Sequence, residues 1–195
     1  MKIRILFFPA LVLFFASAFL QADQNAEHRD QDGFLVQYPS DWRTRRDEHT
    51  FQINFSSDGG IVIGRVPDNR VRPGLGNTDQ LNEMIKSMFV DKAKMVNIAD
   101  LEAPAAQKAG AESGAFGEYL VKDRGGKYTV RVWLFEKGPQ YFMVIAVIKQ
   151  TDINQFSSAL VQIVDSFRII TQDSTPSPAA PASPRLSPGD APPPI

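Results

Sequence analysis

The chain has 195 residues, of which 43% are hydrophobic and 22% charged, values typical of a globular protein with room for one ordinary domain. It contains no cysteine, which excludes disulfides, thiolate metal sites, a cysteine nucleophile and the lipid-modified cysteine of a lipoprotein. The net charge of −1 creates no field that would recruit nucleic acid, so we expect no nucleic-acid partner.

The first part of the chain has the three-part pattern of a secretory signal. Lys2 and Arg4 precede a nearly continuous apolar stretch, and small residues allow cleavage after Ala18 or Ala22. The alternative is an uncleaved membrane anchor, for which the apolar run is short. We therefore predict a signal peptide over residues 1–22 and an exported protein, periplasmic or extracellular. The lack of cysteine favours a bacterial source.

Composition divides the rest of the chain into three parts. Residues 23–32 are polar and are predicted to be a flexible lead-in, and residues 33–171 form the domain. Residues 172–195 are rich in proline, alanine and serine, which predicts a disordered tail. Within the tail, Pro181-Ala-Ser-Pro184-Arg185 matches the general form of a polyproline ligand, although a solvated spacer is the simpler interpretation.

Three short segments at the start of the domain have the pattern of strands. Apolar residues alternate with polar ones over 34–38 and 51–55, and residues 61–63 are apolar on both faces. Pro39 ends the first segment, and turn residues separate the other two. We expect these three strands to form an antiparallel meander.

The next segment has helical spacing. Its apolar residues fall three and four positions apart, and Asn77 to Asp79 supply an N-cap. The two methionines of this apolar stripe suit either core packing or an adaptable binding surface, and the spacing favours the core. The stripe consists of Leu81, Met84, Ile85, Met88 and Phe89.

The second half of the domain combines strands with a final helix. After a short extended piece near 96–101, strong strands are predicted over 116–122, 128–135 and 141–148, the last apolar on both faces. A helix follows, capped by Asp152. The fold class is therefore α+β, an antiparallel β-sheet with helices packed on its faces.

This order of elements resembles the PsbP family, whose fold is shared by the Ran-binding Mog protein. The resemblance spans residues 33–170 and implies an α/β/α sandwich that acts in binding or assembly without catalysis. No functional residue of that family can be matched here. The resemblance is carried by Gly33-Phe-Leu-Val-Gln-Tyr-Pro-Ser-Asp-Trp42, Tyr119, Trp133-Leu-Phe135 and Ile163-Val-Asp-Ser-Phe167.

Few residues could carry chemistry. His28 and His49 are the only imidazoles, and no Gly-x-Ser-x-Gly motif presents a serine to either of them. The acidic residues around His28 match no metal loop, and Gly74 and Gly76 lack the remainder of a phosphate-binding motif. We therefore predict no catalytic residue, no metal site, no cofactor and no enzymatic activity.

One candidate binding site remains. Arginines gather in two parts of the sequence, and they would merge into one basic surface if the neighbouring strands lie side by side. Acidic residues among them would weaken its field. The predicted basic patch consists of Trp42, Arg43, Arg45, Arg46, Arg65, Arg70 and Arg72.

The leading hypothesis for function is an exported, non-catalytic binding or assembly-assisting domain of the PsbP-like type. Its partner would be another exported or membrane-associated protein, and the chain would touch a membrane only if the signal remains as an anchor. One alternative is a periplasmic carrier of a small apolar or lipidic ligand, with Met84 and Met88 facing a cavity. Another is an enzyme of unrecognised type that uses His49.

Overall fold

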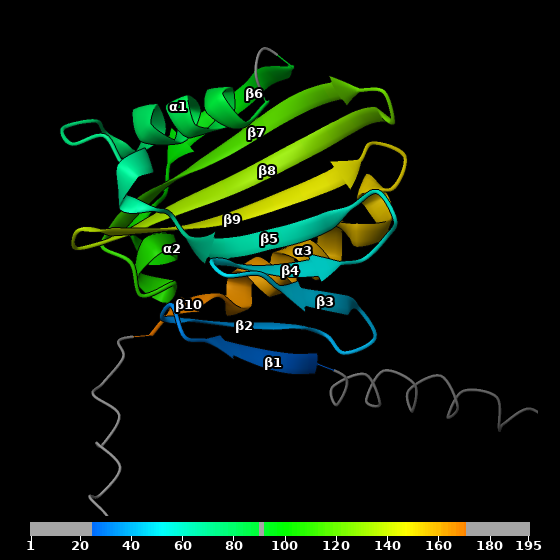
Figure 1. The fold of residues 1–195 in the computed structure, drawn as a ribbon, viewed down its shortest axis with the longest axis horizontal. Helices are drawn as coiled ribbons and strands as arrows, with labels where there is room; N and C mark the ends of the chain where they lie inside the picture. The colour runs from blue at the N-terminus through cyan, green and yellow to red at the C-terminus, as the bar shows by residue number, and fades with distance from the viewer. Residues whose placement is uncertain (1–24, 90–91, 171–195) are drawn as a thin grey trace, which may run out of the picture.

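The computed structural model describes residues 25–89 and 92–170 (Figure 1). Their elements are β1 (Asn25–Asp30), β2 (Phe34–Pro39), β3 (Arg43–Arg46), β4 (Thr50–Asn54), β5 (Gly60–Arg65), the 3-10 turn η1 (Asp68–Arg70), α1 (Asn77–Phe89), β6 (Ala93–Asp100), α2 (Ala103–Lys108), β7 (Ser113–Asp123), β8 (Gly126–Lys137), β9 (Gln140–Lys149), α3 (Ile153–Ser166) and β10 (Arg168–Ile169). The predicted signal peptide (residues 1–22) and the predicted tail (residues 172–195) lie outside the described residues.

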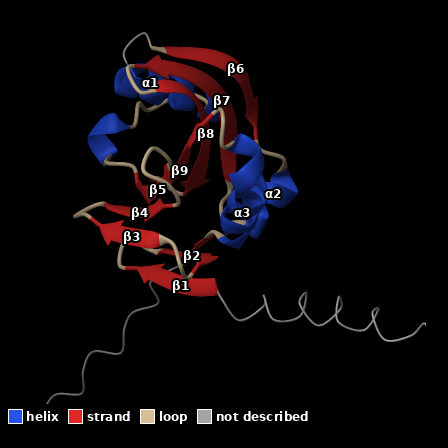
Figure 2. Ribbon diagram, turned by 90° about the vertical axis from the view of Figure 1, so that its right-hand side faces the viewer, coloured by secondary structure: helices blue, strands red, loops and turns tan. Residues whose placement is uncertain are grey.

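A seven-stranded antiparallel sheet forms the centre of the molecule, in the order β3-β4-β5-β9-β8-β7-β6. Helix α1 covers one face of this sheet, and α2 and α3 lie on the other (Figure 2). Strand β9 is central, and its residues Val144, Ala146 and Ile148 are fully buried, as its apolar sequence predicts. The α+β class with helices on both faces of an antiparallel sheet is confirmed.

Helix α1 follows its predicted stripe. Leu81, Met84 and Ile85 are buried against β7 and β8. At its first residue, Asn77 donates hydrogen bonds to the Ser113 hydroxyl at 2.7 Å and to the Glu136 carboxylate at 3.2 Å. These contacts attach the start of α1 to the sheet.

A second, three-stranded sheet has the order β1-β2-β10 and packs against the large sheet and α3. The prediction of one meander was therefore wrong for residues 34–38, because β2 pairs with β1 and with β10, the last strand of the described residues, and not with β4. Within the predicted flexible lead-in over residues 23–32, residues 25–30 form a strand. Strand β1 pairs with β2 along its whole length, from Asn25 opposite Pro39 to Asp30 opposite Phe34.

Four further elements, β3, η1, α2 and β10, were not predicted. Strand β3 is polar and exposed throughout, so its sequence has no alternation to detect. Helix α2 is short, and Gly110 after it has a φ of +77°, where an added Cβ would lie 2.9 Å from the Ile169 carbonyl oxygen. This glycine lets β10 pass close to the end of α2. None of the helices in the described part of the chain has the length and apolar character needed to cross a membrane.

Candidate functional site

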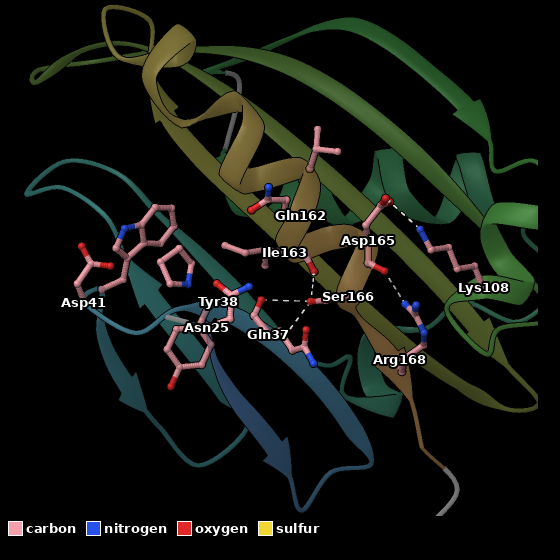
Figure 3. A pocket seen from close by; sticks show the side chains of 13 residues that line it. Asn25, Gln37, Tyr38, Asp41, Lys108, Gln162, Ile163, Asp165, Ser166 and Arg168 are labelled. Carbon is pink, nitrogen blue, oxygen red and sulfur yellow. Dashed lines mark hydrogen bonds and ion pairs between the residues drawn. The ribbon is translucent and has the colours of Figure 1, made fainter. Parts of the chain in front are cut away.

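A large opening in the described structure is a groove between the β1–β2 hairpin and the outer surface of α3 (Figure 3). Its volume is about 990 Å³, and it is partly open to solvent. Both walls carry mainly polar side chains, with a few aromatic and aliphatic ones between them. The lining residues that matter here are Gln37, Tyr38, Asp41, Trp42, Lys108, Val161, Gln162, Asp165, Ser166 and Arg168.

Ser166 joins the two walls of the groove. Its hydroxyl oxygen accepts a hydrogen bond from the Gln37 backbone N–H at 2.9 Å and donates to the Ile163 carbonyl oxygen at 2.7 Å (Figure 3). Two residues further along the chain, β10 begins to pair with β2, with Arg168 opposite Leu35. Ser166, at the end of α3, therefore makes a hydrogen bond to β2 next to the backbone pairing between β2 and β10.

Two aromatic side chains, Tyr38 and Trp42, line one end of the groove. The Trp42 ring centroid lies 5.2 Å from that of Phe55 and 5.9 Å from that of Phe156 on α3. Trp42 thus folds back against the sheet and the first half of α3. It stays half-buried, so part of its ring surface faces the groove beside Tyr38.

The two ends of the groove differ in charge. Asp41 lies at one end, and Lys108 and Arg168 lie at the other (Figure 3). Lys108 forms an ion pair with Asp165 at 2.9 Å, and Arg168 donates to the carbonyl oxygens of residues 165 and 167. Asp41 makes no hydrogen bond or ion pair with any described residue. The groove is therefore acidic at the Trp42 end and carries an excess of positive charge at the other.

One arginine of the predicted basic patch is used inside the structure. Arg46 donates to both carboxylate oxygens of Asp30, at 2.9 and 3.1 Å, and the Asp30 side chain is 1% exposed. His28 lies 2.9 Å from the same carboxylate and stacks on Phe51, with ring centroids 3.7 Å apart. We refer to Asp30, Arg46, His28 and Phe51 as the Asp30 cluster, and it fastens β1 to the large sheet.

The Asp30 cluster controls the charge of its carboxylate. Burial raises the pKa of Asp30, but hydrogen bonds from Arg46, the Asp32 amide and His28 outweigh burial and hold this pKa well below its usual range. The carboxylate in turn raises the pKa of Arg46 through the same hydrogen bond. His28 therefore serves as a hydrogen-bond partner here, and the neighbouring carboxylates of Asp30 and Asp32 both contact Arg46.

The other members of the predicted patch have different surroundings. Trp42 faces the groove, whereas Arg43 and Arg45 alternate with Arg46 and so lie on the opposite face of β3. Within residues 25–89 and 92–170, only Arg43 and Arg70 of the patch lack an acidic partner. The remaining ion pairs join Arg45 to Asp47 at 2.9 Å, Arg65 to Asp68 at 3.0 Å and Arg72 to Glu83 at 3.2 Å. A binding role for the patch stays a prediction.

His49, the other histidine, lies at the surface. Its side chain is 66% exposed, with the Glu48 carboxylate at 3.8 Å. Asp32, Arg65 and Asp68 share a shallow depression with it. The described part of the chain brings together no group of three histidine, aspartate or glutamate side chains that could hold a metal ion.

A second opening lies beside the end of α1. Its volume is about 460 Å³, and Met88, Phe89, Val130 and Val147 line much of it. Met88 is 37% exposed, whereas Met84 is buried in the core at 5% exposure. The two methionines of the stripe therefore have different surroundings, and only Met88 faces an opening.

Sequence analysis missed the groove itself. Gln37 and Ser166 are 129 positions apart, so no local pattern could show that they lie together. Tyr38 and Trp42 were visible as the end of the first motif, and Ile163 to Phe167 as the close of the last helix. Both of these segments contribute residues to the groove, so their conspicuous sequences were the available signal for it.

Comparison of the sequence with protein-family models and with curated proteins gave no match. Solved structures do match. The cyanobacterial PsbP protein (CyanoP) of Synechocystis has a TM-score of 0.53 at 13% identity, covering 75% of this chain and 92% of that chain. The Ran-binding protein Mog1p of Saccharomyces cerevisiae has a TM-score of 0.51 at 8% identity, covering 75% and 95%. The chain therefore has the fold of PsbP and Mog1p, and the resemblance inferred from sequence is confirmed for the fold.

Proposed function

We propose that this chain is an exported, non-catalytic binding domain that holds an extended segment of another protein in the groove between β1–β2 and α3. The observation that carries the proposal is the groove itself, which is open to solvent, has mainly polar walls and is lined by the aromatic residues Tyr38 and Trp42. Export is proposed from the signal pattern of residues 1–22.

The chemistry of the groove suits a polypeptide better than a small molecule. Small-ligand pockets are mostly enclosed and apolar, and a volume of about 990 Å³ with polar walls is at the large end for them. Gln37 and Gln162 can each donate to and accept from a peptide backbone. Trp42 and Tyr38 are residue types that anchor protein interfaces, and the exposed Val161 adds apolar surface between polar neighbours.

The fold supports this assignment. Mog1p, which has the same fold, is a Ran-binding protein and so binds another protein. The partner proposed for this chain is an exported or membrane-associated protein, because it would have to meet the chain after export.

Site-specific crosslinking in the full chain tests the proposal. A photo-reactive amino acid at Gln162 would lie in the groove, and the same probe at the exposed Lys122 would lie on β7, outside it. In the native host we expect a discrete heavier adduct from position 162 and none from position 122.

A matched pair of variants controls the crosslink. Val161→Glu places a charge in the groove, and Leu120→Glu places the same charge at an exposed apolar residue of β7. The adduct should disappear with Val161→Glu and persist with Leu120→Glu. Equal adducts from both probe positions, or loss with both variants, would argue against a protein site in the groove.

A second candidate function, carriage of a small apolar ligand, draws on the opening beside Met88. It predicts saturable binding of an apolar fluorescent dye, displaced by a fatty acid. Met88→Glu should abolish this binding and Val161→Glu should leave it unchanged. No displacement by fatty acid would remove this function.

A further inference from the structure

Strand β6 is the edge of the large sheet opposite β3, so β6 and the β7–β8 hairpin lie away from the β1–β2 hairpin and the groove (Figure 1). Strand pairing gathers basic side chains here, because Lys94 lies opposite Leu120 and Lys122 lies opposite Lys127. Four cations at this end are exposed and have no acidic partner among the described residues, and we refer to them as the cationic edge. They are Lys94, Lys122, Arg124 and Lys127.

Two lysines of the cationic edge repel each other across the sheet. Lys122 and Lys127 are directly opposite, a placement in which like charges are destabilising. On the same two strands, Glu118 lies opposite Arg131, and these two form an ion pair at 2.8 Å. The strands therefore pair opposite charges in one place and like charges near their turn. A local rule that a fold breaks without compensation marks a functional position, and here it indicates an anion bound from outside.

The acidic side chains nearest the cationic edge already have partners. Lys92 donates to Asp123 at 3.0 Å. On the neighbouring strand β9, Lys149 donates to Asp58 at 3.2 Å. In the sequence Asp91 precedes Lys92 outside the described residues, and one such acid still leaves the four cations in excess. The cationic edge therefore presents a net positive charge to solvent.

Exposed apolar side chains gather at the same end of the sheet. Of the five large hydrophobic side chains that the described residues expose, only Val161 lies elsewhere. Leu120 lies between cations of the edge, and Met88 borders the opening that Lys92 also lines. The four at this end are Met88, Met95, Val96 and Leu120, with exposures of 37%, 50%, 53% and 36%.

This combination suits a lipid surface better than a protein. Protein interfaces are enriched in aromatic residues and arginine and depleted in lysine, whereas three of the four cations here are lysines and their apolar neighbours are aliphatic. A lysine stem can lie along apolar surface while its ammonium group reaches a charged headgroup. Peripheral membrane binding combines buried apolar area with attraction to anionic lipids, and each lysine or arginine near such a surface strengthens it about fivefold.

We infer that the cationic edge and its four apolar neighbours bind a membrane surface that contains anionic phospholipids. Lipid phosphates lie against Lys122 and Lys127, where the fold supplies no carboxylate, and Leu120 enters the headgroup region. The sequence predicted membrane contact only through a retained signal, and this surface needs none. The groove lies away from it and stays accessible. Which membrane the chain meets rests on the proposed export, whereas the lipid chemistry does not.

Sedimentation with lipid vesicles tests the inference. The chain is prepared without residues 1–22, because their apolar run would partition into lipid by itself. We expect binding to vesicles of equal parts phosphatidylglycerol and phosphatidylcholine and none to phosphatidylcholine alone. High salt should release the chain, since salt screens exposed charges. Equal binding to the two kinds of vesicle, or none to either, overturns the inference.

Two pairs of substitutions locate the binding surface. Lys122→Gln with Lys127→Gln removes two cations of the edge and should weaken binding to the anionic vesicles about 25-fold. The fold should be retained, because the change removes a repulsion. The control, Arg43→Gln with Arg70→Gln, removes two cations that also lack an acidic partner among the described residues but lie elsewhere, and it should change binding less than about twofold. Equal losses from the two pairs would overturn the inference.

A fluorescent label distinguishes lipid from an acidic protein. The chain has no cysteine, so Leu120→Cys gives a single site for an environment-sensitive dye. Its emission should shift to the blue with anionic vesicles and stay unchanged with polyglutamate, whereas the same dye at the exposed position of Ser158→Cys should respond to neither. A shift with polyglutamate alone overturns the inference in favour of an acidic protein. These measurements need no protein partner, so they can fail while the crosslink at position 162 succeeds, and the reverse also holds.

Discussion

The Asp30 cluster and the groove both include residues of the β1–β2 hairpin, and both contain a carboxylate whose surroundings can be compared. In the cluster, the Asp30 carboxylate is 1% exposed and is bound by Arg46 and His28, so its charge is paired within the fold. In the groove, Asp41 is exposed and meets no described partner. The comparison teaches that a charged residue indicates a binding surface only when the fold leaves it unpaired.

Removing the buried charge should have the largest effect. Asp30→Asn leaves Arg46 facing a neutral amide and weakens the attachment of β1, which should cost about 3 kcal/mol of unfolding free energy. The matched variant Asp41→Asn should change it by less than about 0.5 kcal/mol. Urea unfolding of both variants measures the difference, and equal losses would contradict the comparison.

The pH dependence of stability tests the same carboxylate. Folding lowers the pKa of Asp30 from an ordinary value of about 3.9, so its contribution is complete above about pH 4 and is lost as the pH falls toward the folded value. The stability difference between wild type and Asp30→Asn should therefore be constant near neutral pH and shrink below about pH 4. Urea titrations at a series of pH values measure it. A difference that persists unchanged to about pH 2 would assign it to packing.

A smaller effect is expected at the floor of the groove. Ser166→Ala removes the hydroxyl that accepts from the Gln37 N–H, and the loss of one such hydrogen bond costs about 1 kcal/mol. Ser158→Ala, on the exposed surface of the same helix, is the control and should be nearly neutral. Thermal unfolding distinguishes them. If both variants are neutral, Ser166 does not hold the two walls together.

The wall of the groove should tolerate change best. Val161 is 57% exposed on α3, and glutamate has the higher helix propensity, so Val161→Glu should alter stability by less than about 0.5 kcal/mol. Chemical denaturation beside wild type checks this value. A loss above about 1 kcal/mol would show that Val161 packs as part of the core and that the groove is less open than described.

Much of the fold could be predicted from sequence because burial leaves a periodic trace. Alternation over 128–135 and the apolar run over 141–148 predicted β8 and β9, and the spacing of Leu81, Met84 and Ile85 predicted the buried face of α1. Strands β1 and β3 escaped prediction because both are largely polar. Their strand conformation comes from pairing with β2 and β4.

The candidate site was much less predictable. The arginines of the predicted patch could be counted, but the sequence could not show that Arg46 bonds Asp30 while Arg43 and Arg45 face the other way. The groove needs Gln37 and Ser166 in contact across most of the chain. Such contacts depend on the order of strands in the sheets, which local patterns do not encode.

By itself, the sequence determined the elements that bury apolar surface, the absence of cysteine chemistry, and the signal and proline-rich patterns of the two ends. Only the tertiary structure decided which charged side chains are paired inside the fold and which border an open groove. The reason is physical. Periodicity records how each segment meets the core, whereas pairing of charges and the shape of a groove arise between segments that topology alone brings together.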